Sequence, residues 1–134
     1  MLLILFKVFL ISFLINLAWE VGHSVLYDTC LKLPFKKYTR LIIWTSIKDG
    51  FWISLFYVIS VYIFNNVNIL TNNIQFLFFV IISLIFAFIT EKIAIKYKRW
   101  EYSDKMPKIL GVGITPLPQI ALTGILTFLL VFLT

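Results

Sequence analysis

Apolar runs dominate the chain, and polar segments divide them into four long stretches. These runs cover residues 2–27, 44–64, 76–95 and 115–134. Each reaches about 20 residues or more, the length that an α-helix needs to cross the hydrocarbon core of a bilayer. No stretch alternates apolar and polar residues as a strand would. The pattern therefore predicts an all-α, polytopic membrane protein: one domain, residues 1–134, formed by a bundle of four transmembrane helices.

Composition agrees with lipid as the solvent. Hydrophobic residues make up 61% of the chain and charged residues 13%, whereas an ordinary soluble domain is about 45–50% apolar and about 25% charged. A small soluble fold could not bury so much apolar surface. The single cysteine, Cys30, excludes an internal disulfide and a Cys-based zinc cluster. The N-terminal run has no basic segment before it and no small-residue cleavage site, so we interpret it as a span rather than a signal peptide.

The placement of the basic residues predicts the orientation. All of them except Lys7 lie within or at the edge of two segments, between the first and second runs and between the third and fourth: Lys32, Lys36, Lys37, Arg40, Lys48, Lys92, Lys96, Lys98, Arg99, Lys105 and Lys108. Residues 65–75 carry no Lys or Arg. By the positive-inside rule, both basic segments should be cytoplasmic and both termini extracytoplasmic. The net charge is +6. We expect the basic side chains of these loops to contact anionic lipid headgroups, and we expect no nucleic-acid partner.

Ionisable residues inside a membrane are costly, so each is a functional candidate by default. Four such residues are the candidate catalytic residues, as acids or bases, and all lie in the predicted cytoplasmic half: Glu20, His23, Asp49 and Glu91. Because separate helices place costly polar residues at the same depth, we expect these side chains and Gln119 to share one cavity. The alternative is that each side chain reaches independently into interfacial water.

The first run carries the sharpest polar pattern. Asn16, Glu20, His23 and Tyr27 are spaced i, i+4, i+7 and i+11, so they fall on one helical face. Glu20 and His23 have the Glu-x-x-His spacing of di-iron bundles, but a chain with one histidine lacks the second pair. We therefore expect no metal and no cofactor.

Asp49 and Glu91 each leave two interpretations open. Ser46 and Asp49 match a variant of the capping box, which would place Asp49 in the first turn of the second helix. Glu91 follows Ser83 and other small residues on a stripe typical of helix contacts, so it should face the bundle. The alternative for Glu91 is an interfacial pair with Lys92.

Residues 111–119 contain two glycines and two prolines, which ordinary mid-helix sequence does not. With Thr115 as N-cap and Pro116 at the first helical position, the fourth helix should begin there. Gln119 would then face inward with Thr123 and Thr127. The preceding residues 109–115 would be interfacial or a shallow re-entrant loop. The candidate substrate-binding residues are Asn16, Trp19, Tyr27, Arg99, Trp100 and Gln119.

Short motifs carry a resemblance to a known group of proteins. They are Asn16-Leu17-Ala18-Trp19-Glu20 with Tyr27, Asp49, Glu91, Arg99-Trp100-x-Tyr102 with Met106-Pro107, and residues 111–119 with their Pro-x-x-Gln ending. Here the chain resembles a family of small four-helix bacterial and archaeal integral membrane proteins of unknown function. The resemblance covers nearly the whole chain and brings no activity with it. It implies Gln where this chain has His23. The expected location is a cell (plasma) membrane crossed several times, with a prokaryotic inner membrane as the host.

Three functions fit these observations. The first is a membrane-embedded enzyme or binding protein for a lipid or isoprenoid ligand, in which the acid–base residues act on the head of the substrate. The second is a small proton- or cation-coupled transporter, working as a homodimer. The polar residues do not continue into the outer half, which argues against the second. The third is a non-catalytic assembly or anchoring subunit whose polar residues hold helices together.

Overall fold

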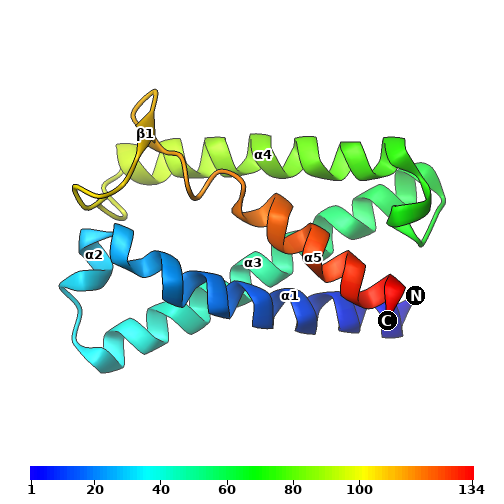
Figure 1. The fold of residues 1–134 in the computed structure, drawn as a ribbon, viewed down its shortest axis with the longest axis horizontal. Helices are drawn as coiled ribbons and strands as arrows, with labels where there is room; N and C mark the ends of the chain where they lie inside the picture. The colour runs from blue at the N-terminus through cyan, green and yellow to red at the C-terminus, as the bar shows by residue number, and fades with distance from the viewer.

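The structure of the chain, a computed structural model, describes residues 1–134 and is almost entirely helical (Figure 1). The main helices are α1 (Leu2–His23), α3 (Phe35–Phe64), α4 (Asn73–Lys96) and α5 (Gln119–Leu133). The short elements are η1 (Ser24–Leu26), α2 (Asp28–Leu31), η2 (Ile69–Thr71), β1 (Lys108–Ile109) and β2 (Val112–Gly113). The two strands form an antiparallel hairpin in which Lys108 pairs with Gly113.

Three helical stretches are long and apolar enough to cross a membrane: 2–26, α3 and α4. The all-helical class is therefore confirmed, and the three helices support the predicted membrane protein. The fourth predicted span is represented by α5, which has 15 residues. At about 1.5 Å per residue this helix is about 22 Å long, less than the roughly 30 Å of a hydrocarbon core.

The second predicted helix begins earlier than its apolar run. We predicted a start near Trp44, but α3 begins at Phe35, directly after Pro34. A helix satisfies its own backbone hydrogen bonds, so it continues into the headgroup region where apolar residues end. Asp49 consequently lies in mid-helix. The hydroxyl of Ser46 donates to the carbonyl of Ile42 at 2.7 Å, so the capping-box interpretation is wrong.

The predicted break in helical structure at residues 111–119 is confirmed, but the predicted start of the fourth helix is wrong. Regular helix begins at Gln119 and not at Thr115–Pro116. Residues 115–118 form turns, because prolines at 116 and 118 remove two backbone donors from this stretch. Part of residues 109–115, predicted to be interfacial or re-entrant, belongs to the β1–β2 hairpin. Gly113 has no room for a side chain there, since a Cβ would lie 2.9 Å from the sulfur of Met106.

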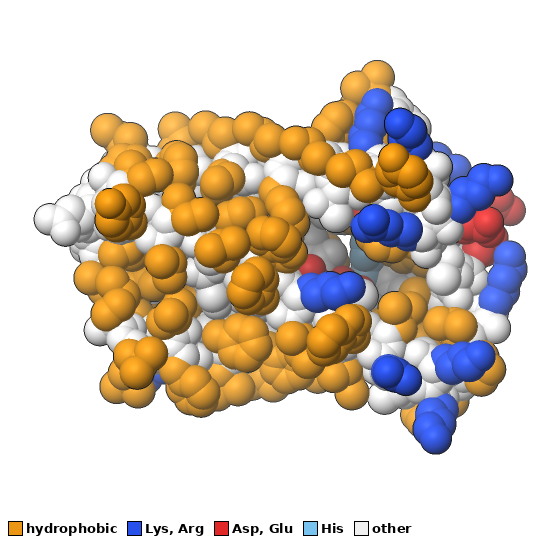
Figure 2. Space-filling view, turned by 180° about the vertical axis from the view of Figure 1, so that it is seen from behind, with side chains coloured by type: hydrophobic (Ala, Val, Ile, Leu, Met, Phe, Trp, Pro, Cys, Tyr) orange, Lys and Arg blue, Asp and Glu red, His pale blue; other side chains and the backbone are white.

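The four long helices pack so that α1 contacts α3 and α5, while α4 also contacts α3 and α5. Both termini lie at one end of the molecule, and α2 and the hairpin lie at the other (Figure 1). Lys and Arg side chains gather at this second end, hereafter the basic end, whereas the rest of the visible face is largely hydrophobic (Figure 2). A buried apolar core joins α1, α3, α4, α5 and η2: Val8, Ile53, Phe56, Tyr57, Val61, Ile69, Phe79, Ile120 and Phe128.

Candidate functional site

The side-chain amide of Gln119, at the start of α5, joins three helices. Its nitrogen lies 2.7 Å from a carboxylate oxygen of Glu20, 2.9 Å from one of Asp49 and 3.1 Å from the amide oxygen of Asn16. Glu20 and Asn16 are on α1, and Asp49 is on α3. An amide nitrogen has two hydrogens, so three oxygens compete for two donors. This crowded arrangement favours an additional donor or a positive charge.

No basic side chain pairs with the acidic residues at this site. The one ion pair in the structure joins Lys32 to Asp28, 3.8 Å apart and partly exposed. The lysines next to Asp49 and Glu91 turn toward aromatic rings instead: Lys48 lies 6.0 Å from the ring centre of Trp44, and Lys92 lies 5.4 Å from that of Phe88. The alternative of a Glu91–Lys92 pair is therefore wrong.

Glu91 is buried on α4 and binds two aromatic residues of the loop that follows. One carboxylate oxygen accepts from the hydroxyl of Tyr102 at 2.5 Å and from the indole of Trp100 at 3.3 Å. Its burial with Ser83 and Ala87 confirms the predicted inward-facing stripe on α4. Glu91 is thus held by neutral donors, with no ion-pair partner.

His23 forms a third set of contacts. Its Nε2 lies 2.6 Å from the hydroxyl of Thr115, and that hydroxyl is 3.1 Å from the sulfur of Met106. Because the Thr115 hydroxyl donates to the sulfur, its oxygen accepts from Nε2 of His23. Thr115 therefore anchors the lead-in of α5 to α1 and does not act as the predicted N-cap.

Tyr27 links these groups through its aromatic ring. Its ring centre lies 5.3 Å from that of His23, 5.5 Å from that of Tyr102 and 6.3 Å from that of Trp100. We name Glu20, Asp49 and Glu91, with Asn16, His23 and Gln119, the acidic cluster. The direct hydrogen bonds of these side chains form three sets of contacts, and the ring of Tyr27 packs between the sets of His23 and Glu91.

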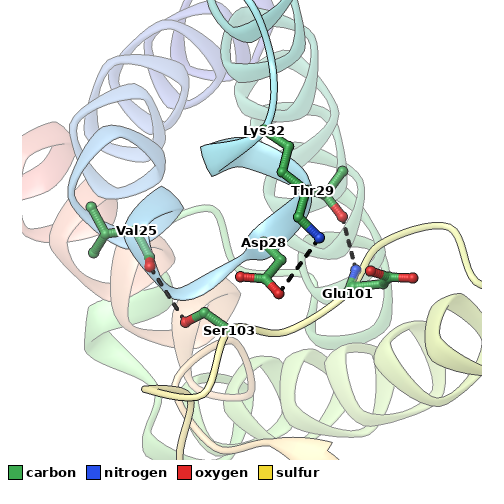
Figure 3. Close-up of polar contacts among 6 residues, drawn as sticks. All are labelled: Val25, Asp28, Thr29, Lys32, Glu101 and Ser103. Atoms are coloured by element: carbon green, nitrogen blue, oxygen red, sulfur yellow. Dashed lines mark hydrogen bonds and ion pairs between the residues drawn. The ribbon is translucent and has the colours of Figure 1, made fainter.

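A backbone clasp holds the loop after α4 against the chain after α1. The amide of Asp28 donates to the carbonyl of Glu101 at 3.0 Å, and that of Ser103 donates to the carbonyl of Leu26 at 2.8 Å. Figure 3 shows the side-chain contacts, with the amide of Glu101 donating to the hydroxyl of Thr29 at 2.9 Å. The clasp fixes the positions of Tyr27 and Tyr102, the two tyrosines that flank the acidic cluster.

The two tyrosines and Cys30 sit in an environment that disfavours charge. Burial raises the pKa of Tyr102 above its ordinary range, and its hydrogen bond to Glu91 adds to this effect. Burial, followed by the charge of Glu91, raises the pKa of Tyr27. Burial also raises the pKa of the Cys30 thiol. These groups therefore remain neutral near pH 7 and can donate hydrogen bonds.

The acidic cluster is not sealed from the surface. Figure 2 shows a hollow at the border between the hydrophobic face and the basic end, with acidic and histidine side chains visible inside it. Lys or Arg side chains flank the opening (Figure 2). The hollow lies on the side of the molecule opposite to the view of Figure 1. A small molecule dissolved in the membrane could approach the cluster from this side.

The structure brings some of the predicted site residues together and leaves others apart. The acidic cluster, Tyr27 and Trp100 come together at the basic end. Trp19 lies beside His23, with ring centres 5.9 Å apart, and its buried indole N–H has no partner. Arg99 is exposed and has no ion-pair partner, so the structure does not place it at the site. No group of three or more His, Cys, Asp or Glu residues is arranged to hold a metal ion.

Sequence reasoning missed several residues. Thr115 and Met106 belong to motifs that we noted, but nothing in their spacing indicates contact with His23. A second polar cluster lies near the termini, where Gln75 is fully buried and donates to the carbonyl of Asn66 at 2.9 Å. The amide of Asn66 donates back to Gln75 at 3.0 Å. This cluster is neutral and internally satisfied, as expected of a structural contact.

Comparisons with known proteins complete the description of the site. No family model, curated protein or solved structure matches the chain.

Proposed function

We propose that the protein is a membrane-embedded protein that binds, and through its acid–base residues converts, a lipid- or isoprenoid-type substrate. The observation that carries this proposal is the hollow of Figure 2, through which acidic and histidine side chains face the hydrophobic surface. Ionisable residues that a membrane protein keeps inside its bundle default to functional roles. The polar head of a substrate would enter this hollow while its apolar tail stays in lipid.

The charge of the acidic cluster restricts which head groups a substrate could have. Glu20, Asp49 and Glu91 have no basic partner, so no positive charge at the cluster would compensate that of an entering phosphate. A hydroxyl head could donate a hydrogen bond to the oxygen that Gln119 leaves without a donor, whereas a carbonyl head could only accept. An amine head would also supply the positive charge that the crowded carboxylates lack. We therefore propose a substrate whose head is neutral or cationic.

The same proposal includes four membrane crossings with both termini extracytoplasmic. Both termini lie at one end (Figure 1), and Lys and Arg gather at the other (Figure 2), which agrees with an even number of crossings. In this arrangement, α5 and the turns at 115–118 together make the fourth crossing. Irregular backbone at membrane depth is tolerated where protein buries it, and Pro116 is buried. The cluster would then open toward the cytoplasmic leaflet of a cell membrane.

The transporter hypothesis has less support. Between the acidic cluster and the neutral Gln75 cluster, the interior is filled by apolar side chains such as Phe79 and Phe128, whose rings lie 4.8 Å apart. The hydroxyls of Thr123 and Thr127 bond to carbonyls of their own helix. No continuous row of free polar groups therefore connects the two ends. An assembly subunit would show no ligand, which the following experiment tests.

The experiment is native mass spectrometry of the protein extracted with its surrounding lipid. We expect a retained neutral or amine-bearing lipid, and about tenfold less of it in the double variant Glu20→Gln/Asp49→Asn, since a lost interaction of about 1.4 kcal/mol is a factor of ten. The matched control is Glu101→Gln/Asp104→Asn, which removes two exposed carboxylates at the same end. Absence of any such lipid, or equal retention in all three proteins, would contradict the proposal.

A further inference from the structure

A second hollow lies outside the acidic cluster, along the first turns of α3. This groove has a volume of about 920 Å³ and runs between α2 and α3. Phe35, Lys36, Lys37, Arg40 and Trp44 are among its lining residues. We call it the α3 groove. It shares no residue with the acidic cluster.

The charge of the α3 groove is entirely positive. Lys36, Lys37 and Arg40 line it, and no acidic residue does. None of the three is in an ion pair, since the one pair in the structure joins Lys32 to Asp28. Lys36 and Arg40 are spaced i, i+4, so they project from the same face of the helix. Three uncompensated cations on one wall favour an anionic ligand.

The remainder of the groove is mostly apolar, and two of its large aromatic side chains are exposed. Phe35 is 82% exposed and Trp44 57% exposed, which is unfavourable in water but normal against lipid. Trp is also enriched at the level of lipid headgroups. Apolar and cationic walls in one groove suit a molecule that has both an acyl chain and an anionic head.

The length of α3 places this groove at headgroup depth. The helix has 30 residues, or about 45 Å at about 1.5 Å per residue, whereas a hydrocarbon core is about 30 Å thick. Because the apolar run covers residues 44–64, the turns that extend past the core are the first ones. The groove lies on these turns, at the basic end, where the phosphates of a bilayer would be.

We propose that the α3 groove is a binding site for one anionic phospholipid. Arg40 holds the phosphate together with Lys36 or Lys37, since a guanidinium binds phosphate oxygens with two parallel donors. Phe35 and Trp44 contact the acyl chain. A symmetric contact between two copies through this groove is disfavoured, because it would bring the same cations together. The site is independent of the proposed function.

The experiment compares two lipids and two triple variants by native mass spectrometry in detergent. The lipids are phosphatidylglycerol, which is anionic, and phosphatidylcholine, which is not. The groove variant is Lys36→Gln/Lys37→Gln/Arg40→Gln. The matched control, Lys96→Gln/Lys98→Gln/Lys105→Gln, removes three exposed cations from the same end outside the groove. Each basic residue near anionic lipid contributes a factor of about five in affinity, so we expect the groove variant to lose roughly a hundredfold in affinity for phosphatidylglycerol.

The control should retain one bound phosphatidylglycerol with nearly unchanged affinity, and phosphatidylcholine should bind weakly to all three proteins. Equal loss in both variants would show that only the general charge of the basic end matters, and would overturn the site. Equal binding of the two lipids by the wild type would also overturn it. Thermal unfolding without added lipid checks that each variant is folded. If the triple variant does not fold, Arg40→Gln alone provides the same comparison.

Discussion

The amide nitrogen of Gln119 lies 2.7 Å from a carboxylate oxygen of Glu20, a residue 99 positions earlier in the chain. The same nitrogen contacts Asp49 on a third helix. Gln119 is almost fully buried, at 7% exposure, and it is the first residue of α5. The irregular lead-in at 115–118 therefore ends at the position where a single donor holds α1, α3 and α5 together.

Replacing Gln119 with Met should destabilise the protein. The thioether fills a similar volume but donates no hydrogen bond, so Glu20 and Asp49 lose a shared donor. Leaving a buried acceptor without its donor costs about 1–3 kcal/mol, and we expect a loss of that size in the free energy of unfolding. Denaturant unfolding in detergent micelles measures it. Unchanged stability of Gln119→Met would contradict the role assigned to this amide.

Glu20 and Asp49 should be energetically coupled. Both accept from one nitrogen, so neutralising either relieves the crowding felt by the other. In a double-mutant cycle with Glu20→Gln and Asp49→Asn, we expect an interaction free energy of about 1 kcal/mol or more. The reference cycle pairs Glu20→Gln with Glu101→Gln, whose exposed carboxylate lies outside the cluster, and it should be additive within about 0.5 kcal/mol. Additivity in both cycles would refute the coupling.

Gly124 should not tolerate a side chain. A Cβ at this position would overlap the ring of Phe79, so α4 and α5 would have to separate. Overpacking a buried contact costs about 1–3 kcal/mol, and we expect Gly124→Ala to lose that much stability. Gly22→Ala is the control, because nothing lies within 4 Å of its Cβ position. Phe79→Leu should partly restore Gly124→Ala, and failure of both expectations would argue against the close α4–α5 contact.

Tyr102 should make stability sensitive to alkaline pH. Its pKa is raised in the folded protein by burial and by the hydrogen bond to Glu91, so folding favours the protonated phenol. This contribution is complete below the ordinary tyrosine pKa of about 10 and is lost as the pH rises above it. Tyr102→Phe should lower stability at pH 7 by about 1 kcal/mol. It should also weaken the decline in stability above pH 10 relative to the wild type. Chemical unfolding at pH 7–11 tests this, and identical pH profiles would contradict it.

A reporter fused after Thr134 should report an extracytoplasmic location. The expectation comes from the basic residues, which lie at the end opposite the termini, together with the positive-inside rule. A periplasmic phosphatase fused there should be active, and a fluorescent protein that requires the cytoplasm should be dark. A fusion in the loop at Asp104 should give the reverse pattern. The opposite result at both positions would invert the orientation and place the acidic cluster in the outer leaflet.

Several parts of the fold could be predicted from local sequence patterns. Apolar runs of sufficient length predict membrane helices because lipid leaves the backbone no other way to satisfy its hydrogen bonds. Thus α1 and α4 begin and end within a few residues of their predicted limits. The inward stripe of Asn16 and His23 was also readable, since helical periodicity alone places them on one face. Asp49 was misplaced because hydropathy marks where lipid contact ends and not where a helix starts.

The sequence by itself determined that this protein belongs in a membrane, which helix faces are polar and that residues 111–119 interrupt the helix. It did so because length, periodicity and proline act locally. Only the tertiary structure decided that Gln119 meets Glu20 and Asp49, that His23 meets Thr115 and that Glu91 meets Tyr102. These contacts depend on how helices far apart in sequence cross and rotate against one another, and on the clasp that returns residues 101–103 to the end of α1. No local pattern specifies such geometry, because it results from packing the whole bundle at once.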